Sequence, residues 1–177
     1  MRSELLSAAK LQEFIDTREQ NVLLFSQRVP MTRWDPVYST IQELDHAASE
    51  AVARGKRNFF CTCGSDFSSL AASYFEGRGN RREDIRFYFL DFAKASERRE
   101  EQEASITGVD GRFYFFRHPA VRLEGEYYKR LLEISSELFA HVPTGALERM
   151  QLYRLAEEMG VPIVNILERA REASRKE

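Results

Sequence analysis

One stretch of the chain decides the fold: Lys56-Arg57-Asn58-Phe59-Phe60-Cys61-Thr62-Cys63-Gly64-Ser65-Asp66. It begins as a short apolar run and ends in a glycine followed by residues that commonly cap helices. This order predicts a strand followed by a helix, the repeating unit of an α/β fold. In such folds ligands collect at the carboxyl ends of strands, so we look for a site first at this turn.

The composition is that of an ordinary globular protein. The chain has 177 residues, 43% of them hydrophobic and 31% charged, with a formal net charge of −2. This length fits one domain with a real core, and the balanced charge does not predict bulk attraction to nucleic acid. No apolar segment approaches the roughly 20 residues that span a bilayer, and residues 1–4 open an amphipathic stretch rather than a signal peptide. We therefore expect a cytoplasmic protein with no membrane partner.

Hydrophobic periodicity predicts alternating helices and strands. The expected helices cover residues 3–17, 36–54, 66–75 and 125–140, and the expected strands cover residues 22–25, 59–62, 85–92 and 112–116. Asp35 is placed to cap the second helix and Gly55 to end it. Asp110-Gly111 is the strongest hairpin signal in the chain, so we expect residues 104–109 and 112–116 to form an antiparallel pair.

These elements predict an α/β fold with a central mixed sheet, flanking helices, one antiparallel hairpin and a C-terminal helical pair. We expect an α/β domain over residues 1–143 and a helical pair over 144–177 packed on it. The pair consists of helices over 146–159 and 163–174. Ala156, Gly160 and Ile166 have the spacing of a helix-turn-helix motif, although the second helix opens with apolar residues that do not suit a DNA groove.

The two cysteines, Cys61 and Cys63, have several interpretations. They point the same way along a strand but lie too far apart for an unstrained disulfide. Two thiolates do not complete a zinc site, and none of the three histidines has a paired ligand spacing, so we expect no metal and no cofactor. Cys63 beside a helix N-terminus is a sensible nucleophile, but Ser69 stands where a phosphatase loop needs arginine. The sequence favours two small apolar residues buried in the sheet.

The turn after the strand is also a candidate anion site. Hydroxyls, backbone N–H groups and guanidinium groups hold anions at such turns. The candidate ligand-binding residues are Cys63, Ser65, Asp66 and Ser68, together with Arg117 and His118 after the aromatic strand. Asp66 is equally explained as a helix cap, and His118 as a polar loop contact. The chain contains neither the Gly-x4-Gly-Lys-Ser/Thr nor the Gly-x-Gly-x-x-Gly motif, which disfavours nucleotide binding by these loops.

From Phe59 to about Val142 the predicted order of elements resembles half of a phospholipase-D-like domain, with a hairpin at Val109-Asp110-Gly111 before a closing helix. Members of that family that act as sensors in transcription regulators carry a similar hairpin. The catalytic His-x-Lys-x4-Asp pattern cannot be placed on any histidine of the chain: His46, His118 or His141. The resemblance therefore implies a binding or sensing role without phosphodiesterase chemistry.

We expect a non-enzymatic regulatory or sensory domain that binds a protein partner or a small anionic ligand near Cys63–Ser69. One alternative is a cysteine- or carboxylate-dependent enzyme that uses Cys63 or Asp66. A second alternative is a DNA-binding regulator that uses the C-terminal helical pair, but the even balance of basic and acidic residues over 144–177 disfavours nucleic acid as a partner. A homo-oligomer is compatible with each of these functions.

Overall fold

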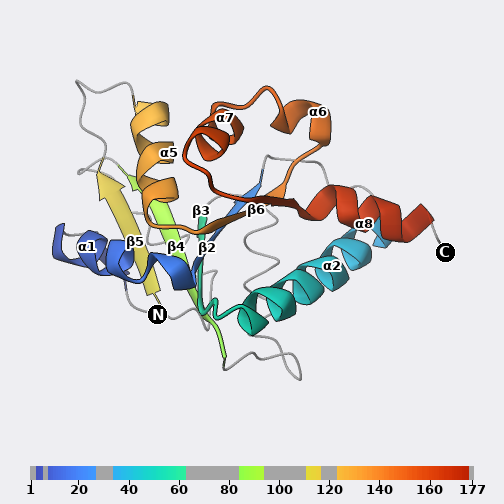
Figure 1. Ribbon diagram of the computed structural model, residues 1–177, viewed down its shortest axis with the longest axis horizontal. Coiled ribbons are helices and arrows are strands. Elements are labelled where there is room, and N and C mark those ends of the chain that lie inside the picture. The colour runs from blue at the N-terminus through green and yellow to red at the C-terminus, as the bar shows by residue number, and fades with distance from the viewer. Residues whose placement is uncertain are drawn as a thin grey trace.

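Seven parallel strands form a single sheet in the computed structural model, which describes residues 3–5, 8–26, 34–62, 84–93, 111–116 and 123–175. The strands are β1 (Ser3–Leu5), β2 (Asn21–Ser26), β3 (Asn58–Thr62), β4 (Arg86–Ala93), β5 (Gly111–Phe116), β6 (Glu137–His141) and β7 (Ile163–Asn165). Their spatial order is β1-β5-β4-β3-β2-β6-β7 (Figure 1). The predicted α/β class is confirmed, but the described sheet is parallel throughout rather than mixed.

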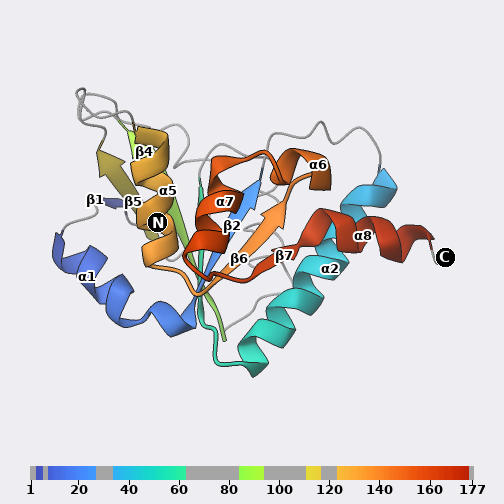
Figure 2. The same cartoon turned by 45° about the horizontal axis from the view of Figure 1, so that its top comes forward.

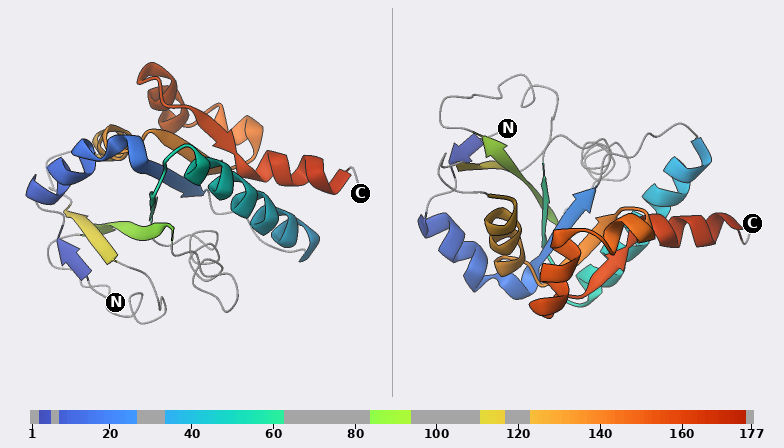
Figure 3. Two further views of the ribbon diagram at one scale, coloured as in Figure 1. Left: turned by 60° about the horizontal axis from the view of Figure 1, so that its bottom comes forward. Right: turned by 90° about the horizontal axis from the view of Figure 1, so that it is seen from above.

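Helices cover both faces of this sheet. They are α1 (Ala8–Asp16), the 3-10 helix η1 (Arg18–Gln20), α2 (Trp34–Ala53), α5 (Leu123–Glu133), α6 (Thr144–Leu147), α7 (Gln151–Glu158) and α8 (Ile166–Arg175). The helices α5 and α7 lie together, and α2 and α8 pack against each other elsewhere on the sheet (Figure 2). Figure 3 shows the pairing of α2 with α8 from two further sides. Among the described helices, none is both long and apolar enough to cross a membrane.

The core is divided between the two faces because successive strand residues point to opposite sides. Val22 and Leu24 belong to the layer under α2 and α8, whose buried members also include Leu44, Ala47, Ala48, Ala51, Phe59, Phe87, Phe139 and Ile166. Leu23 and Phe25 belong to the layer under α1, α5 and α7, with Phe14, Phe60, Leu90, Leu131, Leu132, Leu138, Ala140, Leu152 and Ala156. Strands covered on both sides are apolar at consecutive positions, as in β2.

The predicted antiparallel hairpin is wrong. β5 pairs in parallel with β4 on one side and with β1 on the other, so both of its edges are occupied by parallel strands. The proposed first arm, residues 104–109, lies outside the described residues. The Asp110-Gly111 signal is a local preference, whereas the neighbours of β5 are chosen by contacts with distant parts of the chain. Residues 3–5, expected at the start of a helix, form the edge strand β1 instead.

The helix predicted over 125–140 ends early. α5 stops at Glu133, and residues 137–141 form β6, in which every residue is buried. A short run buried on all sides has no polar face to reveal its period, so periodicity alone does not distinguish a strand from a buried helix. Of the elements that carried the resemblance to phospholipase-D-like domains, the closing helix is present as the shorter α5 and the antiparallel hairpin is not seen, and the resemblance itself stays a prediction.

The C-terminal segment also differs from the predicted pair of consecutive helices. Residues 163–165 form β7, which pairs with β6, and α8 begins only at Ile166. A strand therefore stands where the helix-turn-helix spacing placed the first turn of a second helix. α7 ends at Glu158, Gly160 beyond it has a φ of 71°, and Val161 N–H donates to the Ala156 carbonyl at 2.8 Å. This left-handed glycine turns the chain back into the sheet.

Gly55 ends α2 by the same arrangement, as the sequence predicts. Its φ is 91°, its N–H donates to Val52 O at 2.9 Å, and Lys56 N–H donates to Ala51 O at 3.0 Å. A Cβ at Gly55 or at Gly145 would meet nothing within 4 Å, but of these two glycines Gly55 alone has a positive φ. The difference between the two positions is therefore the backbone conformation and not the available space.

We expect Gly55→Ala to lower the free energy of unfolding by about 1 kcal/mol, because an L side chain disfavours the left-handed region. Gly145→Ala is the matched control and is expected to be neutral or slightly stabilising, since it adds a methyl group to a helical position without strain. Urea denaturation of the three proteins measures both effects. Equal stability of Gly55→Ala and the parent protein would contradict this prediction.

Asn21 joins three segments at the amino-terminal end of β2. Its fully buried side chain donates from Nδ2 to the carbonyls of Phe14 and Ile134, both at 2.8 Å, and its Oδ1 accepts from Asn58 Nδ2 at 2.9 Å. The amide thereby connects the end of α1, the end of α5 and the start of β3. Both bonds are buried, so the Asn21 amide supplies a donor that water does not replace; the Phe14 carbonyl also accepts a longer bond from Thr17 Oγ1 at 3.4 Å.

Asn21→Ala is expected to lower the free energy of unfolding by about 2–4 kcal/mol, because it removes the amide that donates to the buried Ile134 and Phe14 carbonyls and accepts from Asn58. Asn58→Ala removes only one bond of the same group and is expected to cost about 1 kcal/mol. Chemical denaturation followed by circular dichroism gives both values. Similar losses for the two variants would show that Asn21 does not have this central position.

Candidate functional site

The order of the strands reverses at β2. From β2 the chain moves outward through β3, β4 and β5, and then returns to the other side of β2 with β6 and β7. Connections leaving neighbouring strands in opposite directions open a crevice outside their carboxyl ends, where open α/β sheets bind ligands. In Figure 2 the arrowheads of β2 and β6 point to this edge, which we call the carboxyl edge.

Polar residues end three neighbouring strands at the carboxyl edge. They are Thr62 at the end of β3, Ser26 at the end of β2 and His141 at the end of β6, and the next strand, β7, ends at Asn165. Ser26 and His141 are partners in the register of the β2–β6 pair. Each of these strands has an apolar residue or a cysteine directly before its polar last residue, so the change to polar residues coincides with the edge where the sheet meets its connecting loops.

His141 is held in its neutral form. It is only 3% exposed, and burial together with the nearby Arg171 guanidinium lowers the pKa of its imidazole from 6.5 to about 4. Both causes disfavour a second positive charge at this position. At neutral pH, His141 therefore presents an imidazole with one donor and one acceptor nitrogen.

A set of hydrogen bonds fixes the segments around His141. Asn165 Nδ2 donates to the Val142 carbonyl at 3.0 Å, and Asn165 Oδ1 accepts from Glu168 N–H at 3.1 Å, which caps α8. The Glu168 carboxylate in turn accepts from the Thr144 N–H and from Arg171 Nη1, both at 3.4 Å. The residues after β6 are thereby tied to the first turn of α8, which gives this part of the edge a defined shape.

The ligand-binding residues predicted from the sequence lie outside the described residues: Cys63, Ser65, Asp66, Ser68, Arg117 and His118. Their predecessors in the chain are described. Thr62, which precedes Cys63, ends β3, and Phe116, which precedes Arg117, ends β5. Only β4 separates these strands, but β5 extends further: Thr62 is paired with Leu90 of β4, whereas Phe116 is paired with Ala93, three residues further along. Cys61 lies within β3, where its register partners are Leu24 and Phe89.

Sequence reasoning missed His141, Asn165 and Arg171 as a group. His141 had been placed after a helix, and Asn165 inside one. The available signal was the position of His141 directly after the apolar residues Leu138, Phe139 and Ala140, which becomes meaningful once this run is a strand. Within the described ranges, no three His, Cys, Asp or Glu side chains are grouped to hold a metal ion.

The protein is a parallel α/β protein whose chain adds strands first on one side of β2 and then on the other. A scan against protein-family models finds no match, and a search of curated proteins finds no similar sequence. A functional proposal for this chain thus depends on its sequence and on the geometry of its sheet.

The buried histidine makes stability depend on pH. Because the folded pKa of His141 lies below the unfolded value, the unfolded protein binds the proton first as the pH falls from 6.5 towards 4. His141 therefore contributes stability above pH 6.5 that is lost on acidification, by about 2–3 kcal/mol near pH ~4.5.

Denaturation at several pH values tests this expectation. His141→Gln is expected to lose less stability between pH ~7 and ~4.5 than the parent protein, because it carries no titrating group at this position. His46→Gln is the control, since His46 is an exposed α2 residue whose Nε2 lies 3.1 Å from the Glu50 carboxylate. Parallel pH profiles for the parent and His141→Gln would contradict the prediction.

Proposed function

We propose that this chain is a non-enzymatic regulatory or sensory α/β domain that binds a small anionic ligand at the carboxyl edge of its sheet. The observation that carries the proposal is the reversal of strand order at β2, which marks this edge as the ligand-binding side of an open α/β sheet. Residues 63–69 follow β3, the direct neighbour of β2. The proposed ligand site is therefore this segment together with the strand ends beside it.

The residue types around this edge suit an anion. Hydroxyls of Ser65 and Ser68 are hydrogen-bond donors, and the guanidinium of Arg117 is a forked donor that matches carboxylate and phosphate oxygens. The described residues add a neutral imidazole, His141, and the positive charge of Arg171. A binding role without phosphodiesterase chemistry also agrees with the resemblance to non-catalytic phospholipase-D-like sensor domains.

The test is a titration with inorganic phosphate, followed by NMR on the full chain. We expect amide signals at the ends of β2, β3 and β6 to shift, and we expect phosphate to raise the pKa of His141. A negative charge at about 10 Å would stabilise the imidazolium by an amount on the order of one pKa unit. Both readouts report the location of the anion, not only its presence.

Variants of the proposed ligands provide the second part of the test. Ser65→Ala with Ser68→Ala, and separately Arg117→Gln, are expected to weaken phosphate binding about tenfold or more. Ser49→Ala and Arg149→Gln are matched controls on α2 and after α6, where Ser49 Oγ and Arg149 Nε each donate to a backbone carbonyl. Unchanged signals and an unchanged His141 pKa would reject the ligand proposal and favour a protein partner.

Two further measurements separate the alternative functions. Rapid alkylation of Cys63 by iodoacetamide in the folded protein would favour the cysteine-dependent enzyme, because a low-pKa thiolate reacts whereas a buried thiol does not. Salt-dependent binding of duplex DNA would favour the DNA-binding regulator. The proposal expects neither result.

A further inference from the structure

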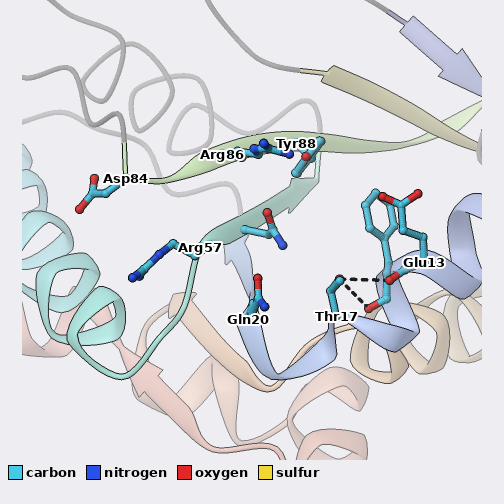
Figure 4. Close-up of a pocket in the computed structure, with 9 residues that line it drawn as sticks. Glu13, Thr17, Gln20, Arg57, Asp84, Arg86 and Tyr88 are labelled. Atoms are coloured by element: carbon cyan, nitrogen blue, oxygen red, sulfur yellow. Dashed lines mark hydrogen bonds between the residues drawn. The ribbon is translucent and has the colours of Figure 1, made fainter.

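A pocket of about 450 Å³ opens at the amino-terminal edge of the sheet, between α1, η1 and the first residues of β3 and β4 (Figure 4). This volume lies within the range of small-molecule sites. We infer that the pocket binds an uncharged aromatic amide, with the amide group on the Asn58 side chain and the ring against Tyr88. The inference goes beyond the function proposed above, because that function is assigned to the opposite edge of the sheet.

The hydrogen bonds of Asn21 fix the orientation of the Asn58 side chain. Asn21 Nδ2 donates to two carbonyls, so the oxygen of the Asn21 amide faces Asn58 and accepts from its Nδ2 at 2.9 Å. This bond uses one of the two Nδ2 hydrogens of Asn58. Within the described residues, neither the other hydrogen nor Asn58 Oδ1 has a partner. Asn58 lines the pocket, so it offers one fixed donor and one fixed acceptor, which match the N–H and the carbonyl of an amide.

Tyr88 and Asn58 lie on the same face of the sheet, within reach of one small ligand. The Tyr88 ring stacks on the Phe60 ring with centroids 5.4 Å apart. Asn58 precedes Phe60 by two residues in β3, so both side chains point to this face. Asn58 is the register partner of Arg86, which places Tyr88 one strand across and two residues along. The two Cα atoms are therefore roughly 8 Å apart, a separation that a ring with one amide substituent spans.

The helix α1 borders the same space. The Phe14 ring lies 5.6 Å from the Tyr88 ring, and the Phe14 carbonyl accepts from Asn21, the hydrogen-bond partner of Asn58. Tyr88 and Phe14 both line the pocket and pack against one core layer. Figure 4 shows Tyr88 on β4 with Glu13 of α1 across the pocket from it. Since Tyr88 is half-buried and held by the core, a flat ring packs against it with little loss of side-chain freedom.

The charged side chains of the lining are already engaged within the protein, which is why the ligand is uncharged. Lys10 Nζ lies 3.2 Å from both carboxylate oxygens of Glu13, and Asp84 and Arg86 each have an interaction of their own. A charged ligand would lose hydration in the pocket without gaining a ready ion pair. An amide exchanges its hydrogen bonds with water for hydrogen bonds with Asn58.

Arg57 also lines the pocket but lies on the side of α2. Its Nη1 donates to the carbonyls of Val52 at 2.9 Å and Lys56 at 2.8 Å. Val52 packs against the core layer under α2, whereas Tyr88 packs against the layer on the other face of the sheet. Binding of the aromatic amide therefore does not depend on the Arg57 guanidinium, and this residue provides a control.

The experiment uses three uncharged probes: benzamide, methyl benzoate, which keeps the ring and the carbonyl but has no N–H, and acetamide, which has no ring. Each is titrated to about 10 mM into the full chain, and backbone N–H signals are followed by NMR. We expect benzamide to shift the signals of Asn58, Arg86 and Tyr88 but not those of His141 and Asn165. Methyl benzoate is expected to bind about tenfold more weakly because it leaves Asn58 Oδ1 without a donor, and acetamide because it lacks the ring.

Substitutions complete the test. Asn58→Ala is expected to weaken benzamide binding about tenfold, and Tyr88→Leu about fivefold. Arg57→Gln is expected to leave it unchanged, and so is Gly55→Ala, which controls for a general loss of stability. Equal binding of benzamide and methyl benzoate, shifts located elsewhere, or no shift at the highest concentration would overturn the inference. The three probes are compared on the unaltered protein, so they decide the matter even if a variant unfolds.

Discussion

The buried side chain of Asn21 fixes the start of the strand around which the whole sheet is arranged. Three hydrogen bonds connect it to the ends of α1 and α5 and to Asn58 on β3. Its own carbonyl accepts from the N–H and the hydroxyl of Ser136, just before β6. The two strands that flank β2 are thus aligned with it by one residue, in addition to the ladder hydrogen bonds. A parallel pair has no hairpin turn to set its register, so such contacts carry that role.

The remainder of the amino edge continues this polar arrangement. Lys56 is almost fully buried, and its ammonium donates to the Glu19 carbonyl at 2.7 Å and to Ser136 Oγ at 2.8 Å. Arg54 Nη2 lies 2.6 Å from the Glu137 carboxylate at the start of β6. Charged groups held in this way anchor the connections between elements, and their hydrogen bonds offset the cost of burial.

The two edges of the sheet therefore have different physical characters. At the carboxyl edge the strands end in polar residues, and His141 is kept neutral by burial and by Arg171. At the amino edge, arginine and lysine side chains bond to backbone carbonyls, and aromatic rings close one side of a pocket.

The apolar runs of the sequence determined much of the sheet. Residues 22–25, 59–62, 85–92 and 112–116 were predicted as strands and coincide with β2, β3, β4 and β5 except at residue 85, one before β4. The helix ended by Gly55 was also predicted. Local composition suffices for these elements because each contains enough apolar residues in sequence for the preference of those residue types for a strand or a helix to be recognised. The candidate ligand residues could be predicted because they follow the strands predicted over 59–62 and 112–116. The group around His141 could not be predicted, because β6 was not predicted as a strand.

Only the tertiary structure decided the rest. β1 and β7 have three residues each, and a segment of that length becomes a strand because a neighbour offers it hydrogen bonds, not because of its own preference. β6 has apolar residues at three consecutive positions, Leu138, Phe139 and Ala140, so periodicity did not identify it as a strand and we predicted a helix there; its pairing with β2 and β7 makes it a strand. The sequence by itself determined that this is an α/β protein and where most strands run. The order of those strands, and with it the placement of His141 and Arg57 at opposite edges, depended on contacts between residues far apart in the chain, which no local pattern encodes.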